Sequence, residues 1–213
     1  MAIIHQATLT PTKLELLADW LPGRAWYPEP TADNLEQVGS CRFDDPAGEV
    51  GVEVFIVRDG DGPLVHVPLT YRGAPLADAE HWLVGTMEHS VLGTRWVYDA
   101  VGDPVYVAAL AETIRTGGHQ ADEIVETESG PAKRDPLITV AGTGTGTGKG
   151  RPGAAAGPAV RVEDGDPAVV VTDTVRLNIR RVLTDHPADE ELALTGTLPG
   201  RLPGPVVLAT LDQ

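Results

Sequence analysis

The chain of 213 residues carries 31 acidic and 16 basic residues, a formal net charge of −15 that repels phosphate backbones and anionic lipid headgroups. We therefore expect neither nucleic acid nor a membrane surface as a partner. The single cysteine, Cys41, excludes an internal disulfide and a cysteine-based zinc site, whereas 42% apolar residues suffice for a sizeable core. The N-terminus lacks a basic segment followed by an apolar stretch, so we expect a cytoplasmic protein.

The first predicted elements are a strand and a helix. Apolar and polar residues alternate over Ile3–Leu9, which favours a strand. Thr10 or Thr12 can cap the helix that follows, and Pro11 is tolerated in its first turn. The helix presents one apolar face, formed by Leu14, Leu16, Leu17, Trp20 and Leu21.

A hairpin is predicted next. Alternation over Glu49–Arg58 and Pro63–Arg72 indicates two strands, and Asp59–Gly62 supplies residues that tolerate positive φ in a tight turn. An Asp-rich turn can also suggest calcium, but the longer ligand series of an EF-hand is missing, which favours a plain turn. A shorter strand over Gln37–Phe43 is expected beside this pair.

The stretch from Leu92 to Ile114 is the most ordered part of the sequence. Strands are predicted over Thr86–Leu92 and Arg95–Ala100, where aromatic and β-branched residues alternate with other types. Asp103 and Pro104 then predict the start of a helix that ends near Gly117. Together these elements predict an α+β fold, in which one or two helices pack on a curved antiparallel sheet.

The sequence changes character after Gly118. A low-complexity stretch over Ala141–Pro158 predicts a flexible loop, and its GTGTGTGKG segment lacks the Gly spacing and the Ser or Thr of a phosphate-binding P-loop. We predict a short helix over Pro187–Leu194. Short strands are predicted around these segments, over Glu123–Glu128, Pro136–Val140, Ala159–Glu163, Ala168–Thr172, Thr174–Val182 and Pro205–Leu211.

Candidate site residues are few. Exposed tryptophans can stack on sugar rings, and Trp26 and Trp82 fall in predicted loops, whereas Trp20 and Trp96 fit core-facing positions. His66, Glu88 and Asp99 are the ionisable residues we nominate for a ligand pocket. The histidines lack the spacing of a zinc site and are expected to be exposed, and Ser90 lacks a nucleophile elbow. We therefore assign no catalytic residue, cofactor or metal.

Three separated motifs carry a resemblance. The segments LELLADWLPGRAWYP, VPLTYRG and GTRWVYDAVGDPVYVAAL follow one another in the order seen in a known family. Residues 1–118 resemble the N-terminal cap domain of actinobacterial maltokinases and related aminosugar kinases. The resemblance implies a curved antiparallel sheet with a helix, similar to the cystatin fold.

Residues 159–194 resemble the first strands of a kinase N-lobe. In the family, a strand ending in an arginine pair carries the lysine that contacts ATP. Here TVRLNIRRVL has Arg180 and Arg181, but Leu177 or Asn178 stands in place of the lysine that pairs the nucleotide phosphates. The sequence ends at Gln213 before a kinase C-lobe, so we expect a degenerate N-lobe start without catalytic activity.

These observations divide the chain into a cap-like domain (1–118), a connecting region (119–158) and a kinase N-lobe-like β segment (159–213). The first hypothesis is a stand-alone, non-catalytic accessory or regulatory module that binds a protein, such as a kinase or an enzyme of α-glucan or trehalose metabolism. The second is a small-ligand protein that binds a sugar. The third is an uncharacterised enzyme using Asp99, His66 and Glu88.

Overall fold

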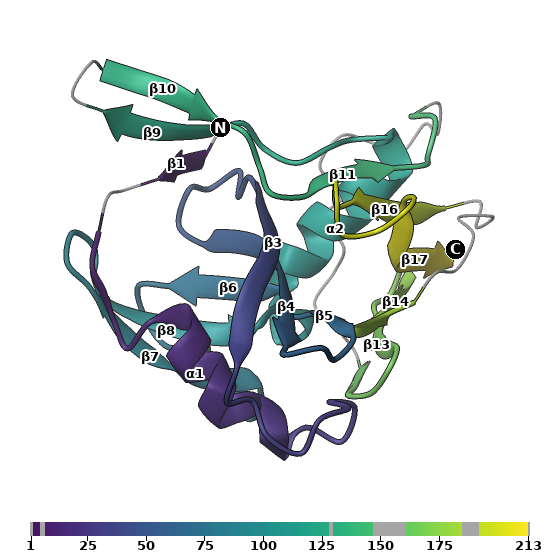
Figure 1. The fold of residues 1–213 in the computed structure, drawn as a ribbon. Helices are drawn as coiled ribbons and strands as arrows, with labels where there is room; N and C mark the ends of the chain where they lie inside the picture. The colour runs from purple at the N-terminus through teal and green to yellow at the C-terminus, as the bar shows by residue number, and fades with distance from the viewer. Residues whose placement is uncertain (1, 5–6, 128–129, 147–160, 185–191, 213) are drawn as a thin grey trace.

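The computed structural model describes residues 2–4, 7–127, 130–146, 161–184 and 192–212 (Figure 1). It contains two α-helices and three β-sheets within these ranges. Short 3₁₀ turns occupy Leu21–Gly23, Glu80–Trp82 and Ala100–Gly102. None of the helices in the described ranges is long and apolar enough to cross a membrane.

The largest sheet is antiparallel and curled, and it contains the predicted hairpin (Figure 1). Its central strand, β4, pairs with β3, β5 and β6, and the sheet continues through β8 and β7 to β2. The predicted α+β arrangement of a curved antiparallel sheet with packed helices is therefore confirmed. Its eight strands are β2 (Leu9–Thr10), β3 (Leu35–Phe43), β4 (Gly51–Asp59), β5 (Leu64–His66), β6 (Leu69–Arg72), β7 (Leu83–His89), β8 (Gly93–Asp99) and β15 (Val182–Leu183).

Two predicted strands in the first half of the chain are each divided in the structure. The stretch Pro63–Arg72 is interrupted at Val67 and Pro68, because proline has no N–H to donate to a neighbouring strand. The stretch Ile3–Leu9 is also wrong as a single strand. Strand β1 (Ala2–Ile4) pairs in parallel with β9, whereas β2 pairs with β7 of the large sheet.

The helices begin and end where local sequence signals place them. Helix α1 (Lys13–Trp20) starts with a capping box, in which the Thr12 hydroxyl accepts from the Glu15 N–H while the Glu15 carboxylate accepts from the Thr12 N–H. Helix α2 (Pro104–Thr116) is capped by Asp103 and ends at Gly117, whose φ of 67° suits glycine.

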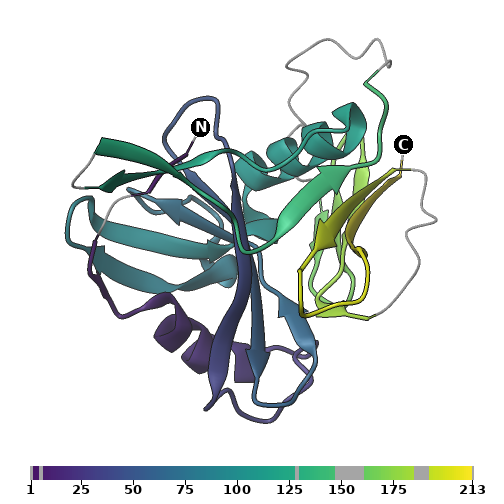
Figure 2. The same cartoon turned by 45° about the horizontal axis from the view of Figure 1, so that its top comes forward.

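The second half of the chain forms two further sheets. A three-stranded sheet combines β1, β9 (Glu123–Thr127) and β10 (Gly130–Arg134), of which β10 was not predicted. A six-stranded antiparallel sheet packs beside α2 (Figure 2). Its strands are β11 (Thr139–Gly142), β12 (Arg161–Glu163), β13 (Ala168–Val171), β14 (Arg176–Ile179), β16 (Ala193–Thr197) and β17 (Val206–Asp212).

Three predictions for this half need correction. The predicted strand Thr174–Val182 is divided, because its middle part forms β14 of the six-stranded sheet and Val182 begins β15 of the large sheet. The first residues of the predicted flexible loop are ordered against the end of α2, because the Gly144 N–H donates to the Ile114 carbonyl at 2.9 Å. A side chain at Gly142 would lie 2.0 Å from the Thr113 carbonyl oxygen, so only glycine fits this close approach. Residues 147–158 of that loop lie outside the described residues. Of the predicted helix Pro187–Leu194, residues 187–191 also lie outside them, while Ala193 and Leu194 belong to strand β16.

Two apolar cores lie on opposite faces of the large sheet. Val52, Val54 and Ile56 of β4 contribute to one core, which also contains α2 and the six-stranded sheet. Phe55 and Val57, the alternate residues, contribute to a second core beneath α1. Strand β4 is therefore buried on both faces, as a central strand between two layers requires.

Candidate functional site

The resemblance motifs meet at two buried carboxylates. Asp103 caps α2 and also accepts two hydrogen bonds from Arg72, each 2.7 Å long, and one of 2.8 Å from the Thr70 hydroxyl. This arrangement joins the Val-Pro-Leu-Thr-Tyr-Arg strand to the Asp-Pro turn. Such bidentate pairs are stronger and more directional than neutral hydrogen bonds, so the contact fixes the start of α2 against the sheet.

The second carboxylate, Asp99, binds an arginine from the far part of the chain. Arg181 is completely buried, and its two terminal nitrogens donate to the Asp99 carboxylate at 3.1 and 2.5 Å. The guanidinium also lies 4.5 Å from the centre of the Trp26 ring, a cation–π contact. Burial raises the pKa of Asp99 above its usual value, although the charge of Arg181 acts against this shift.

His66 lies beside the same arginine, and the expectation that it is exposed is wrong. It is fully buried, its backbone N–H donates to the Arg181 carbonyl at 2.7 Å, and its Nδ1 is 3.0 Å from the Arg180 carbonyl. Burial and the nearby charge of Arg181 lower the pKa of His66 to about 3. The ring is therefore neutral at physiological pH.

The five nominated residues do not form one pocket. Trp26, predicted in an exposed loop, is only 7% exposed, and its indole N–H donates to Asp164 at 2.7 Å. Trp26, His66 and Asp99 therefore meet around Arg181. Trp82 is half-buried against Gly102, and Glu88 is exposed and accepts from the Thr94 hydroxyl at 2.7 Å. Whether any of the five binds a ligand stays a prediction.

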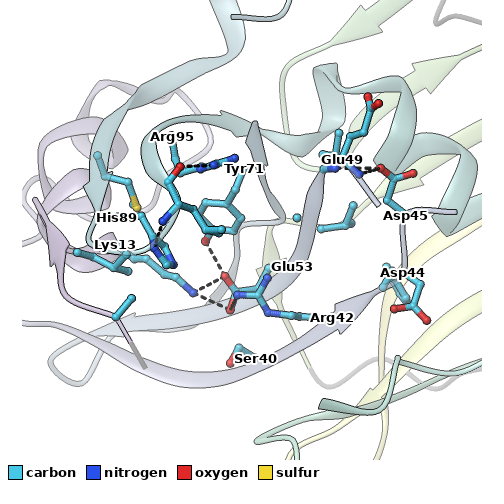
Figure 3. A pocket seen from close by; sticks show the side chains of 18 of the residues that line it. Lys13, Ser40, Arg42, Asp44, Asp45, Glu49, Glu53, Tyr71, His89 and Arg95 are labelled. Atoms are coloured by element: carbon cyan, nitrogen blue, oxygen red, sulfur yellow. Dashed lines mark hydrogen bonds and ion pairs between the residues drawn. The ribbon is translucent and has the colours of Figure 1, made fainter. Parts of the chain in front are cut away.

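A different part of the large sheet forms a polar pocket of about 730 Å³ (Figure 3). It lies between the start of α1 and strands β3, β4 and β6, and its volume is typical of sites for small molecules. Lys13, Arg42, Glu53 and Tyr71 gather in one part of the pocket. Asp44, Asp45 and Glu49 lie in another part, on the β3–β4 loop and its ends (Figure 3).

The centre of the pocket is the carboxylate of Glu53, whose side chain is 4% exposed. Lys13 donates to its two oxygens at 2.9 and 2.6 Å, and the Tyr71 hydroxyl donates at 2.5 Å (Figure 3). Burial favours the neutral acid, but the positive charges of Lys13 and Arg42 and the hydrogen bonds from Lys13 and Tyr71 outweigh it. Together they lower the pKa of Glu53, which is therefore ionised at neutral pH.

Gly51 lies tightly against the Tyr71 ring, with Arg42 beside it. A side chain at Gly51 would lie 3.3 Å from the Tyr71 ring and 3.5 Å from a terminal nitrogen of Arg42. With glycine there, the Arg42 guanidinium lies 5.8 Å from the centre of the Tyr71 ring and 4.0 Å from Glu53. The pocket therefore holds an arginine and a lysine around a single carboxylate.

This pocket was not predicted from the sequence. One signal was available, since Glu53 interrupts the apolar run from Gly51 to Val57 and its side chain points to the same face as Phe55. A buried carboxylate of this kind requires a cationic partner. The sequence did not reveal that partner, because Lys13 precedes Glu53 by 40 residues on a separate helix. Among the described residues, no group of three or more His, Cys, Asp or Glu side chains is positioned to hold a metal ion.

The fold and its buried contacts define an α+β module whose motifs link a curled sheet to one helix. Residues 20–103 match the family model of the maltokinase N-terminal cap domain. The resemblance to that domain is thereby confirmed over this segment, which contains Trp26, Asp99 and the pocket residues Arg42 and Glu53. A search of curated proteins found no match.

Proposed function

We propose that this chain is a cytoplasmic, non-catalytic cap-like module that acts as an accessory or regulatory protein. Its partner in this proposal is a sugar kinase or another enzyme of α-glucan or trehalose metabolism. The similarity of residues 20–103 to the maltokinase cap supports the association with a maltokinase. The division into a cap-like domain (1–118), a connecting region (119–158) and a degenerate N-lobe-like segment (159–213) is part of the same proposal.

The contact that carries the non-catalytic proposal is the burial of Arg181. Arg181 follows β14, the strand that resembles the ATP-contacting strand of kinases. Leu177 on β14 is also fully buried. Arg181 is bound bidentately by Asp99 and covered by Trp26, so it holds the two large sheets together. A side chain engaged in this way is not available to a nucleotide phosphate.

One surface groove suits a protein partner. It has a volume of about 750 Å³ and lies between the β3–β4 loop and the outer face of α2, with Val105, Ala108 and Ala109 on its wall. Its exposed Glu112 carboxylate favours a partner segment with apolar and basic side chains, whereas Asp122 is already paired with Lys133.

The purified chain tests this proposal in two assays. It should not phosphorylate maltose with ATP and magnesium, and it should bind a purified maltokinase from the same organism and change its kcat or KM. Ala108→Arg, which places a bulky cation in the groove, should abolish that effect, whereas Arg58→Gln on the far end of β4 should not. Phosphorylation by the chain alone, or no binding to the kinase, would contradict the proposal.

A second candidate function is the binding of a small sugar. The polar pocket around Glu53 favours it, because sugar hydroxyls need closely placed donors and acceptors such as Ser40, Gln37 and Glu49. Titration with maltose, trehalose and glucosamine tests this function. A saturable binding signal with any of the three supports it, and the absence of a binding signal with all three contradicts it.

A further inference from the structure

The pocket around Glu53 has more positive charge at its centre than its own carboxylate neutralises. Lys13 and Arg42 lie 2.6 and 4.0 Å from Glu53, so two cations share one anion. Arg95 and Arg134 also line the pocket; Arg134 is paired with Glu123, whereas Arg95 donates to the Leu92 carbonyl. A local excess of this kind is unexpected in a chain of net charge −15, and it attracts an anionic group.

The arginines of the pocket retain unused hydrogen-bond donors. The Nε atoms of Arg42 and Arg95 have no acceptor among the described residues, but they are buried, so only the terminal guanidinium nitrogens can reach a ligand. The Arg42 side chain remains 21% exposed and lines the pocket, and its contact with Glu53 at 4.0 Å is too long for a hydrogen bond. A guanidinium presents its donors as a planar fork that matches a carboxylate or a phosphate.

Glu53 itself is not available to a ligand. Both of its oxygens already accept from Lys13, and one of them also accepts from Tyr71. The buried carboxylate therefore positions Lys13 and Arg42 and leaves their remaining donors facing the cavity. Since Glu53 is 4% exposed and hydrogen-bonded on both oxygens, the site is built into the sheet and is not a chance cluster of surface charges.

The other end of the pocket has the opposite chemistry. Asp44, Asp45 and Glu49 lie there, separated from the cationic group (Figure 3). Carboxylates accept hydrogen bonds from hydroxyl groups and repel anions. A cavity of about 730 Å³ also exceeds the size of a single phosphate ion. The ligand that fits both ends has one anionic group and a hydroxyl-bearing body.

We propose that this pocket binds a phosphorylated sugar, with the phosphate held by Arg42, Arg95 and Lys13 and the sugar hydroxyls directed toward Glu49, since both oxygens of Asp45 already accept backbone N–H groups. The proposal deepens the second candidate function, on which it rests, and it is independent of the accessory role. It places recognition on β3, β4 and β8 and the start of α1, away from Trp26 and Trp82.

Calorimetric titration of the full chain at low ionic strength tests the proposal. The probes are glucose 1-phosphate, glucose 6-phosphate, glucose and inorganic phosphate. At least one sugar phosphate should bind saturably and at least tenfold more tightly than glucose and than inorganic phosphate. Arg42→Gln should weaken that binding by about tenfold to a hundredfold, since it removes a charge-assisted contact.

Matched variants separate a binding role from a folding role. Arg58→Gln makes the same substitution on β4 outside the pocket and should bind like the wild type, and circular dichroism checks that each variant folds. Arg95→Gln provides a second test if Arg42→Gln is unfolded. Equal binding of glucose and its phosphates would overturn the phosphate contact while leaving sugar binding intact. Absence of binding by all four probes, equal binding of inorganic phosphate, or unchanged binding by both arginine variants would overturn the proposal.

Discussion

Two buried carboxylates of the same sheet have different surroundings. Asp99 is bound by Arg181 in a fully enclosed contact, and neither side chain is more than 1% exposed. Glu53 is bound by Lys13 at the wall of a pocket, where Lys13 remains 20% exposed. The first pair joins distant parts of the chain, with partners 82 residues apart, whereas the second leaves cationic donors open to a cavity.

The two pairs differ in the burial of the cation, which is complete for Arg181 and incomplete for Lys13. A fully enclosed pair has lost its hydration and is stable only when both partners are present. A pair with one partly hydrated member can change partners at lower cost, because the solvent screens and solvates the exposed charge. By this criterion, Asp99 and Arg181 hold the fold together, and Glu53 and Lys13 form a site.

The largest effect is expected for Arg181→Met. The variant leaves Asp99 buried without its counter-ion, so the free energy of unfolding should fall by about 3–5 kcal/mol. Urea unfolding followed by tryptophan fluorescence measures this change. The double variant with Asp99→Leu should recover at least half of the loss, because it removes the unpaired charge. A loss below about 1 kcal/mol for the single variant would contradict a structural role.

A smaller loss is expected for Lys13→Met. Glu53 keeps its hydrogen bond from Tyr71 and the nearby charge of Arg42, so the free energy of unfolding should fall by about 1–3 kcal/mol. The same urea experiment measures it. Lys13→Arg keeps the charge and is the control. If Lys13→Met were as destabilising as Arg181→Met, the distinction between the two pairs would be lost.

His66 should make stability depend on pH. Its pKa is lowered from 6.5 to about 3 by burial and by Arg181, so the unfolded chain binds more protons between these values. The contribution of neutral His66 to the free energy of unfolding is fully present above pH 6.5. It decreases as the pH falls below that value, by up to about 1.4 kcal/mol per pH unit. Urea unfolding at pH 6.5 and pH 4.5 should show a smaller decrease for His66→Gln than for the wild type. His119→Gln, an exposed control, should follow the wild type.

The smallest effect is expected for Arg58→Met. Arg58 donates to Glu36 at 2.6 Å, but the two side chains are 30% and 46% exposed. Exposed ion pairs contribute about 0–1 kcal/mol to stability, so the free energy of unfolding should fall by less than about 1 kcal/mol. Thermal denaturation with and without 0.5 M salt provides the measurement. A loss comparable to that of Lys13→Met would show that exposure does not rank these pairs.

The sequence predicted best those features that depend on neighbouring residues. Asp103 and Gly117 mark helix ends through their own hydrogen bonds and φ angles, and the structure confirms both positions. Of the two threonines predicted to cap the first helix, Thr10 and Thr12, it is Thr12 that does so. The curved sheet also followed from alternation along its strands. Pro68 has no N–H and could have indicated the break between β5 and β6. Apolar and polar residues alternate on both sides of it, however, so the sequence predicted one continuous strand.

The candidate site could not be predicted in the same way. Alternation shows which face a side chain occupies but does not identify the distant residue that meets it. Glu53 was visible as a charge in an apolar strand, whereas Lys13 and Arg42 become its partners only when α1 and β3 pack beside β4. Trp26 was placed in a loop correctly, but its contacts with Asp164 and Arg181 bury it.

Strand β4 has a further consequence for cooperativity. Its alternate residues belong to two different apolar cores, so neither core can be disrupted without exposing one face of this strand. The cap-like sheet and the layer containing α2 are therefore thermodynamically coupled, and melting of one removes support from the other. The backbone amides of β4 should exchange with solvent only through global unfolding, which makes this strand the slowest-exchanging segment of the molecule.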